Sequence, residues 1–470
     1  MRWLAALGLV AVLAGTGHGA AEVDLPPVTR VTLENGLRVI VAESRELPLV
    51  EMYVMVGAGA AQDPAGKEGL AALTAGALRR GAGDLSAEGL ARAIESLGGT
   101  LEAGAGTDAT IVNGEFLSED FTRGLDLLRL VLREPTFAND EVRRQRDEQL
   151  AGLVAELEDP SAVAEKCFAA FLYGSYPYGR PQDGRPKSVA DLDRGDVRDF
   201  YARWYAPNNT ILVLVGDVTA GDAVARVREV FGSWPARADA VPQRTGPPPP
   251  VDSRRVLLVD KADSTQTQIR IGAMAMKRSD PNLLPAQVAN TILGGGFSSK
   301  LIEELRVKRS LTYSASSGYV ARLTGGDFRL ATFTKSPTTV ETLSLALDVE
   351  GAFRTTPPDA KLLTKAKAYL QGQFPLRVET PDALASRLAE MEFFGLPNDD
   401  LETYRTRVGA VTVDEAAQVS ARYMPDPDKV AIVVVGKASE VRAPLEAKYG
   451  PVRVTTPEAC AELATSPVDR

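Results

Sequence analysis

The end of the first half of the chain recurs at the end of the second half, and this repeat constrains the fold more than any other feature. The first copy reads VRDFYARWYAPNNTILVLVGDV and the second reads AAQVSARYMPDPDKVAIVVVGKA. Each copy predicts an amphipathic helix, a turn at Pro-Asn or Pro-Asp, a buried β-strand and a glycine. The two glycines, Gly216 and Gly436, are 220 residues apart. The sequence therefore predicts two tandem copies of one unit of about 220 residues.

A proline-rich segment separates the two copies. Residues 235–255 include four consecutive prolines, which exclude a helix or a central strand there. The expected organisation is a signal peptide at 1–21, an N-terminal unit at 22–236, a linker at 237–255, a C-terminal unit at 256–450 and a tail at 451–470.

The pattern within the first unit indicates its fold class. Alternating apolar residues around Asn35 and Gly36 predict a hairpin followed by a longer strand. Helical spacing follows at 70–80, 87–97 and 121–133, with a strand at 108–117 between the last two. Strands followed by helices favour an α+β fold, here two homologous units, each a mixed sheet flanked by helices.

The N-terminus is typical of a secretory signal peptide. Arg2 precedes an apolar run from Trp3 to about Ala14, and small residues follow through Ala21. An uncleaved N-terminal anchor is the alternative interpretation. No later stretch approaches the roughly 20 apolar residues of a membrane span. We therefore expect a periplasmic or secreted protein without a membrane span once the signal is removed.

Charge and histidine content exclude several function classes. The formal net charge of −9 gives no basic surface for nucleic acid. The one histidine, His18, lies in the predicted signal peptide. The mature chain would therefore lack Ser-His-Asp and Cys-His triads and any His-ligated zinc. The two cysteines, Cys167 and Cys460, form no C-x-x-C motif, and the sequence leaves open whether they are bonded.

Several motifs resemble one family of enzymes. They include an NGL hairpin, a GAG strand end, a G-x-x-G-L-A helix start, LGGTLEAG, DEVRRQRDE and FYARWYAPNNTILVLVGDV. In this order they resemble the pitrilysin/insulinase-type zinc peptidases, on the branch that includes mitochondrial processing peptidase and paired bacterial periplasmic proteins. The resemblance extends from about residue 27 to about residue 449.

The resemblance implies a degenerate metal site. Active members carry His-x-x-Glu-His on the helix after G-L-A, with two zinc ligands and a general base, and a Glu ligand on a later helix. Here the matching positions are Ala72, Ala75, Gly76 and Gly152. All four are small and non-ligating, so no metal is expected in this chain.

A second family feature is retained. Active members need an Arg and a Tyr seven residues apart, and Arg306 and Tyr313 match in type and spacing. Such a pair can bind a substrate backbone and stabilise an oxyanion. The alternative is structural, because an Arg near a helix C-terminus and a Tyr in a strand often only stabilise the fold. We expect a helix over 298–309 that ends near Arg306, and a strand that begins near Tyr313.

Two further features concern substrate binding. The glycines Gly294, Gly295 and Gly296 lack the spacing of a phosphate-binding loop, so we interpret them as allowing backbone approach to a peptide or as a hinge. The family's Asn-Ala substrate-edge motif is Glu102-Ala103 here. That departure argues against peptide binding along the first unit's edge strand.

Together these features give one leading hypothesis and one alternative. The family builds a closed clamshell from four units, and this chain supplies two. We expect a non-catalytic subunit of a periplasmic heterodimeric zinc metallopeptidase, with Arg306 and Tyr313 serving a homologous His-x-x-Glu-His subunit that holds the zinc. The substrate would be a peptide or an unfolded protein. The alternative is an inert peptide-binding or scaffold protein, resembling the core proteins of respiratory complexes. An unrelated hydrolase with a Ser-Lys or Asp-pair centre has no support from residue spacing.

Overall fold

A computed structural model describes residues 25–241, 246–460 and 462–463. The predicted signal peptide at 1–21, with His18, lies outside the described residues, as do 242–245 of the predicted linker and most of the predicted tail beyond 460. None of the helices in the described part of the chain combines the length and apolar character that a membrane crossing needs.

The first half of the chain forms one mixed sheet of six strands. Its order is β1-β2-β8-β3-β7-β6, with β2 and β8 parallel and the other neighbours antiparallel. The strands are β1 (Val28–Thr32), β2 (Arg38–Glu43), β3 (Leu49–Val56), β6 (Glu102–Ala105), β7 (Thr110–Leu117) and β8 (Thr210–Gly216). A separate small hairpin pairs β4 (Gly81–Ala82) with β5 (Leu85–Ser86).

The second half repeats this sheet. Its order is β11-β12-β10-β13-β9-β14, with β13 parallel to β9. The strands are β9 (Arg255–Asp260), β10 (Thr267–Ala275), β11 (Ala315–Ala321), β12 (Gly326–Thr334), β13 (Ala431–Gly436) and β14 (Arg453–Thr455). Five successive strands therefore match between the sheets in order and direction, and the predicted α+β fold of two tandem units is confirmed. Strand β14 lies within the segment expected as a tail and pairs with β9.

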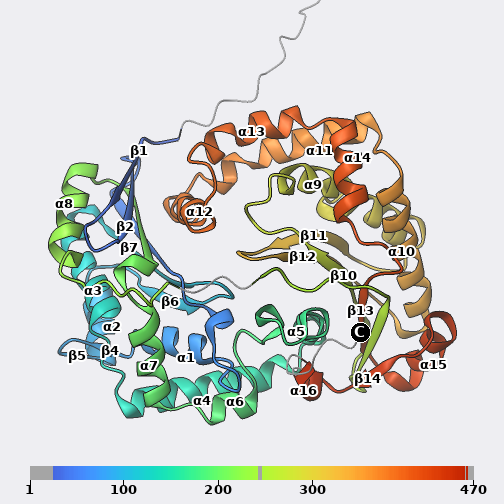
Figure 1. The fold of residues 1–470 in the computed structure, drawn as a ribbon, viewed down its shortest axis with the longest axis horizontal. Coiled ribbons are helices and arrows are strands. Elements are labelled where there is room, and N and C mark those ends of the chain that lie inside the picture. Colours follow the sequence, from blue (N-terminus) through green and yellow to red (C-terminus); the bar gives the residue numbers. More distant parts are fainter. Residues whose placement is uncertain (1–24, 242–245, 461, 464–470) are drawn as a thin grey trace, which may run out of the picture.

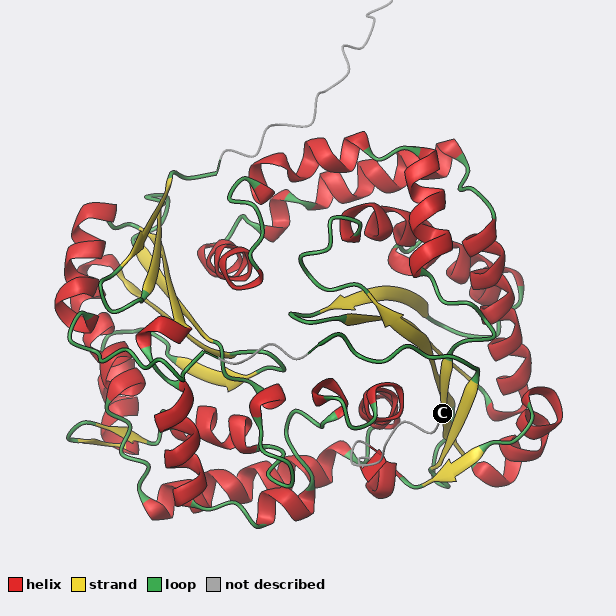
Figure 2. Cartoon of the chain, viewed as in Figure 1, coloured by secondary structure: helices red, strands yellow, loops and turns green. Residues whose placement is uncertain are grey.

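Helices cover both sheets, mostly on their outer sides (Figures 1 and 2). The first half contains α1 (Leu70–Ala77), α2 (Ala87–Glu95), α3 (Phe121–Arg133), α4 (Asn139–Glu156), α5 (Pro160–Tyr173), α6 (Pro186–Ala190), α7 (Arg194–Trp204) and α8 (Ala220–Phe231). The second contains α9 (Leu283–Asn290), α10 (Thr339–Thr355), α11 (Ala360–Gln373), α12 (Pro381–Phe394), α13 (Asp400–Ala410), α14 (Val413–Tyr423), α15 (Ala438–Tyr449) and α16 (Pro457–Cys460). The helices expected at 70–80, 87–97 and 121–133 are all present, the first two slightly shorter.

Each sheet has one face covered by a helix from the other half. Helix α12 packs on β3 and β8 of the first sheet, where Leu388 meets Val213 in one apolar cluster. Helix α5 packs on β10 and β13 of the second sheet, where Phe168 meets Val433. This exchange binds the two halves together, because each fully buried large apolar side chain contributes about 1.5–3 kcal/mol.

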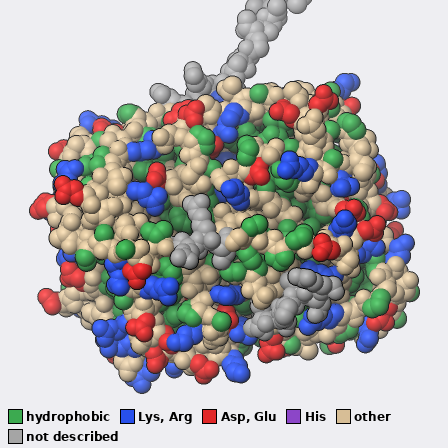
Figure 3. Space-filling model, viewed as in Figure 1, with side chains coloured by type: hydrophobic (Ala, Val, Ile, Leu, Met, Phe, Trp, Pro, Cys, Tyr) green, Lys and Arg blue, Asp and Glu red, His purple; other side chains and the backbone are tan. Residues whose placement is uncertain are grey.

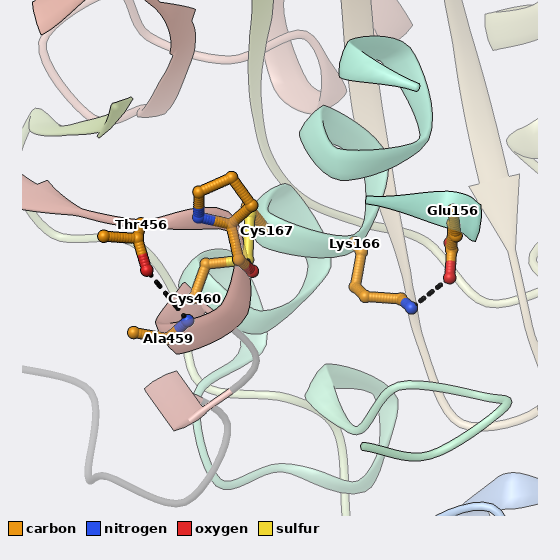
Figure 4. The surroundings of a disulfide bond; sticks show 7 residues. Glu156, Lys166, Cys167, Thr456, Ala459 and Cys460 are labelled. Atoms are coloured by element: carbon orange, nitrogen blue, oxygen red, sulfur yellow. Dashed lines mark hydrogen bonds and ion pairs between the residues drawn. A yellow bond between two sulfur atoms is a disulfide. The ribbon is translucent and has the colours of Figure 1, made fainter. Parts of the chain in front are cut away.

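Polar contacts and a disulfide strengthen the same junction. The Tyr173 hydroxyl of α5 donates to the buried Asp327 carboxylate at 2.8 Å. The Asp108 carboxylate accepts from the Leu323 backbone N–H at 3.0 Å. A disulfide joins Cys167 of α5 to Cys460 of α16, with Cα atoms 5.3 Å apart (Figure 4). Packing, hydrogen bonds and a covalent link therefore join the two units.

Gly216 shows why the repeated glycine is needed. Its φ is +143°, and a Cβ atom there would lie 2.0 Å from the Leu49 carbonyl oxygen. Only glycine avoids that overlap while β8 stays paired with β3.

On the face shown in Figure 3, basic and acidic side chains are interspersed.

Candidate functional site

The predicted metal-site positions lie on two helices that pack together. Helices α1 and α4 are in contact, and Ala72, Gly76 and Gly152 line one cavity of about 540 Å³. We call it the degenerate-site cavity; the remaining lining residues are Ala103, Gly104, Ala105, Gln145, Glu148, Gln149, Leu153, Glu156 and Asp183. Ala75 is fully buried and does not line the cavity. The structure therefore brings three of the four predicted positions together.

A glutamine side chain fills the space beside Gly76. A Cβ atom on Gly76 would lie 2.6 Å from Nε2 of Gln145, whose Oε1 accepts a hydrogen bond from Nε of Arg80 at 3.1 Å. One turn further along α4, Gln149 donates to the carbonyl oxygens of Gly69 and Asp183 at 3.0 and 2.9 Å. Sequence reasoning missed both glutamines, although their spacing from Gly152 places all three on one face of α4.

The residues present do not fit a zinc ion. Alanine and glycine at 72, 76 and 152 supply no ligating side-chain atom, and two of the cavity's three carboxylates are paired with basic side chains. Glu148 pairs with Arg80 and Glu156 pairs with Lys166. Within the described ranges, no group of three or more His, Cys, Asp or Glu side chains could hold a metal ion. A catalytic zinc ion needs three such ligands and a water molecule.

A buried carboxylate fixes the start of α1. Asp63 accepts hydrogen bonds from the backbone N–H groups of Gly69 and Ala71, both at 2.8 Å. Burial raises the pKa of Asp63 to about 8, although both hydrogen bonds and Arg180 act in the opposite direction. Asp63 thus holds a helix whose N-cap, Gly69, has a left-handed backbone and no capping side chain.

The edge strand beside this cavity is partly closed. Strand β6 is the last strand of the first sheet. Gln182 donates from Nε2 to the Ala105 carbonyl oxygen at 2.7 Å, and Arg79 pairs with Glu102. Both contacts occupy groups on β6 that an added peptide strand would approach.

Arg306 and Tyr313 come together on the second unit. The guanidinium carbon of Arg306 lies 4.6 Å from the centroid of the Tyr313 ring. It also lies 5.6 Å from the ring of Phe297, which sequence reasoning missed. Tyr313 is 72% exposed and Phe297 80% exposed, so this Arg306 cluster presents two aromatic rings to solvent. Phe297 directly follows three glycines, and this pattern in the sequence could have identified it as a candidate site residue.

The backbone around the cluster differs from the expected helix and strand. Arg306 lies in a π-helical segment, η6 (Ile302–Lys308), instead of a helix spanning 298–309. Ser310 then has a φ of +54°, which ends the helical path. Strand β11 begins at Ala315, so Tyr313 lies in the connecting loop. Irregular helices and strained residues of this kind concentrate at functional sites.

The three glycines have different surroundings. A second π-helical segment, η5 (Thr291–Gly295), contains Gly294 and Gly295. A Cβ atom on Gly294 would lie 2.3 Å from Oγ of Ser317, so Gly294 is needed for packing against β11. Gly295 faces Asn290, while Gly296 leads directly to Phe297.

The two candidate sites lie in different units. Segment η6 contacts α10 and β11, which lie in the opposite half of the molecule from α1 and α4 (Figure 1). Neither Arg306 nor Tyr313 lines the degenerate-site cavity. The cluster is therefore separate from this chain's own cavity.

Two family descriptions match the chain. Residues 38–182 match the description "Insulinase (Peptidase family M16)", and residues 191–370 match "Peptidase M16 inactive domain". A Pseudomonas fluorescens structure titled as a peptidase M16 inactive domain has a TM-score of 0.82 and 28% identity, covering 87% of this chain and 98% of that one. A protease structure from Helicobacter pylori shares the fold with a TM-score of 0.79 and 20% identity, covering 87% of this chain and 100% of that one.

Curated relatives carry both active and inactive names. A protein of Mycobacterium leprae named as an uncharacterized zinc protease is 32% identical over 295 residues, which is 62% of this chain and 65% of that relative. The non-peptidase homolog YmxG of Helicobacter pylori is 24% identical over 382 residues, which is 80% of this chain and 87% of the relative. The chain therefore belongs to the insulinase family, peptidase family M16, and carries non-ligating residues at the positions that match the family's metal site.

Proposed function

We propose that the chain is the non-catalytic subunit of a heterodimeric zinc metallopeptidase. Its two units would form half of a clamshell, and a homologous His-x-x-Glu-His subunit would form the other half and hold the zinc. Arg306 and Tyr313 would bind a peptide at the partner's zinc site and stabilise negative charge on the carbonyl oxygen under attack.

The observation that carries this proposal is the contrast between two sites in one chain. The degenerate-site cavity has lost ligands at 72, 76 and 152 and holds the amide of Gln145 beside Gly76. The Arg306 cluster keeps its guanidinium against two exposed rings, and nothing within the chain's own cavity uses it. A half-buried Arg against exposed Phe and Tyr rings has the composition of a protein interaction hot spot.

The test is peptide cleavage by the two chains mixed in equal amounts. The partner is the His-x-x-Glu-His homologue from the same organism. Arg306→Ala and Tyr313→Phe should each lower kcat by about 10²–10³, the usual effect of removing one oxyanion donor. Arg309→Ala, close to the cluster, and Arg198→Ala on α7, far from it in sequence, are the controls, because both arginines are exposed and neither belongs to the cluster. If the controls and the two variants have equal activity, the proposal is wrong.

We also propose that the protein works in the periplasm. The support is the predicted signal peptide, together with a disulfide, which persists in an oxidising compartment. Cell fractionation followed by N-terminal sequencing tests this. A mature N-terminus near residue 22 in the periplasmic fraction is expected, and an intact Met1 in the cytoplasm would contradict it.

The alternative function is a scaffold without a catalytic partner. The partial closure of β6 by Gln182 and Arg79 favours it, because it leaves little room for an added strand. A relative named as a non-peptidase homolog favours it as well. A scaffold would tolerate both Arg306→Ala and Tyr313→Phe without loss of assembly.

A further inference from the structure

A second large cavity, of about 680 Å³, lies in the C-terminal half, away from both candidate sites. Its walls come from the start of α9, from β11 and from the segment that runs through α12 and α13. Tyr319, Met391 and the rings of Phe374 and Tyr404 line it. These two rings are stacked, with centroids 4.7 Å apart. The size and aromatic lining are typical of small-molecule and peptide sites.

Four arginines also line this cavity, which we call the arginine-lined cavity. Two of them are paired with carboxylates. Arg407 pairs with Asp400 at 2.6 Å, and Arg387 pairs with Glu390 at 2.8 Å. These pairs account for two of the four carboxylates in the lining. They hold the arginines in fixed positions at the cavity wall.

The other two arginines are less closely paired with carboxylates. The nearest approach of Arg278 to a carboxylate is 3.9 Å, to Glu390, which already pairs with Arg387. Arg377 forms no ion pair with any described residue. The remaining two carboxylates have local roles: Asp280 accepts from Asn282, and Glu415 accepts from Thr412 at the start of α14. The lining therefore carries as many carboxylates as arginines, but the Arg377 guanidinium is not paired with any of them and can donate to a ligand.

Tyr404 lies at the centre of this charge. Burial raises the pKa of its phenol, while Arg377, Arg387 and Arg407 act to lower it and the nearby Asp400 acts to raise it. Its hydroxyl donates no hydrogen bond to the described part of the chain. A neutral donor surrounded by arginines and next to a stacked ring can bind an anionic group whose body is apolar.

We propose that the arginine-lined cavity binds a carboxylate carried by an apolar or aromatic body. Arg377 and Arg278 would hold the carboxylate, and the Phe374–Tyr404 stack would cover the apolar part. Two sources share this chemistry: the C-terminal residue of a peptide and a free aromatic or aliphatic acid. The proposal stands independently of any partner subunit, because every residue it uses lies in this chain.

The test is isothermal titration calorimetry with the full mature chain. The probes are N-acetyl-phenylalanine, a pentapeptide ending in phenylalanine, and the same two molecules with amidated carboxyl groups. We expect a carboxylate probe to bind at micromolar to millimolar concentration and its amide at least about tenfold more weakly, since the amide loses a charge-assisted hydrogen bond. Tighter binding of the pentapeptide indicates a peptide terminus, and equal or tighter binding of the single residue indicates a free acid.

Two variants and one control assign the binding to this cavity. Arg377→Gln and Arg278→Gln should each weaken the carboxylate probe about tenfold and leave the fold intact, because neither side chain has a close ion pair. Arg198→Gln on α7 is the matched control, since this exposed arginine does not line the cavity. Equal binding of acid and amide would overturn the proposal. So would the absence of binding by either acid up to 10 mM, about the weakest binding worth measuring. It would also be overturned if Arg377→Gln and Arg278→Gln both bind the carboxylate probe as the wild type and the control do.

Discussion

Glu51 is a buried acid with an unsatisfied oxygen, and it should make the protein less stable as the pH rises. It lies on β3 facing α12 and is 2% exposed, and its Oε1 has no hydrogen-bond partner. Burial, and after it the nearby carboxylates Glu115 and Asp382, together raise its pKa from 4.5 to about 8. The folded protein therefore binds this proton more tightly than the unfolded chain does.

The sign and size of the effect follow from this pKa difference. Well below pH 4.5 the Glu51 carboxyl is neutral in both the folded and the unfolded state, so its titration does not change the free energy of unfolding. Between pH 4.5 and 8 the unfolded chain ionises first, so the free energy of unfolding falls as the pH rises. The loss from Glu51 is about 1 kcal/mol at pH 5, about 3 kcal/mol at pH 7 and about 5 kcal/mol at pH 9.

The perturbation is Glu51→Gln, which keeps the shape and removes the titration. Urea unfolding followed by circular dichroism at pH 5, 7 and 9 measures the free energy of unfolding. The variant should be more stable than wild type by about 1 kcal/mol at pH 5, about 3 kcal/mol at pH 7 and about 5 kcal/mol at pH 9. Glu119→Gln, at an exposed position, is the control and should change nothing. A variant that is less stable at pH 7, or whose difference from wild type is independent of pH, would refute the reasoning.

Three further predictions concern the fold. Gly216→Ala should lower the free energy of unfolding by more than about 3 kcal/mol, because the new Cβ atom would overlap a carbonyl oxygen. Gly221→Ala is the control: this glycine lies in open space on α8, so the change should leave the protein equally stable or more stable. Thermal melting measures both. Cys167→Ser removes the disulfide and should lower the free energy of unfolding by about 2–4 kcal/mol, with the reduced wild type equally destabilised. Asp327→Asn breaks a buried carboxylate that pairs with two arginines and should cost about 3–5 kcal/mol, measured by urea unfolding; a cost below 1 kcal/mol would contradict this.

The repeat and the strand pattern were sufficient to predict the two-unit α+β fold. Gly216 and Gly436 end the central strands β8 and β13, as the repeat implied. The exchange of α5 and α12 between the sheets could not be predicted, because an apolar helix face does not specify which sheet it covers. The pairing of Cys167 with Cys460 depends on that exchange, since α5 carries one of the two cysteines.

The candidate site was predictable only in part. The alignment of motifs located Ala72, Gly76 and Gly152, and the structure brings them to one cavity. It gave no sign that Gln145 occupies the space at Gly76, because that contact is set by the packing of α1 on α4. The stacking of Arg306 between two rings depends on the π-helical backbone at 302–308 and on the left-handed Ser310, neither of which has a clear sequence pattern.

The most direct test of the central claim is to measure zinc content and peptide cleavage for three samples: this chain alone, its His-x-x-Glu-His homologue alone, and the two mixed. Our account predicts no stoichiometric zinc and no cleavage for this chain alone. It predicts full cleavage only in the mixture, with the zinc on the homologue. One tightly bound zinc with peptidase activity in this chain alone, or full activity of the homologue without it, would contradict the account.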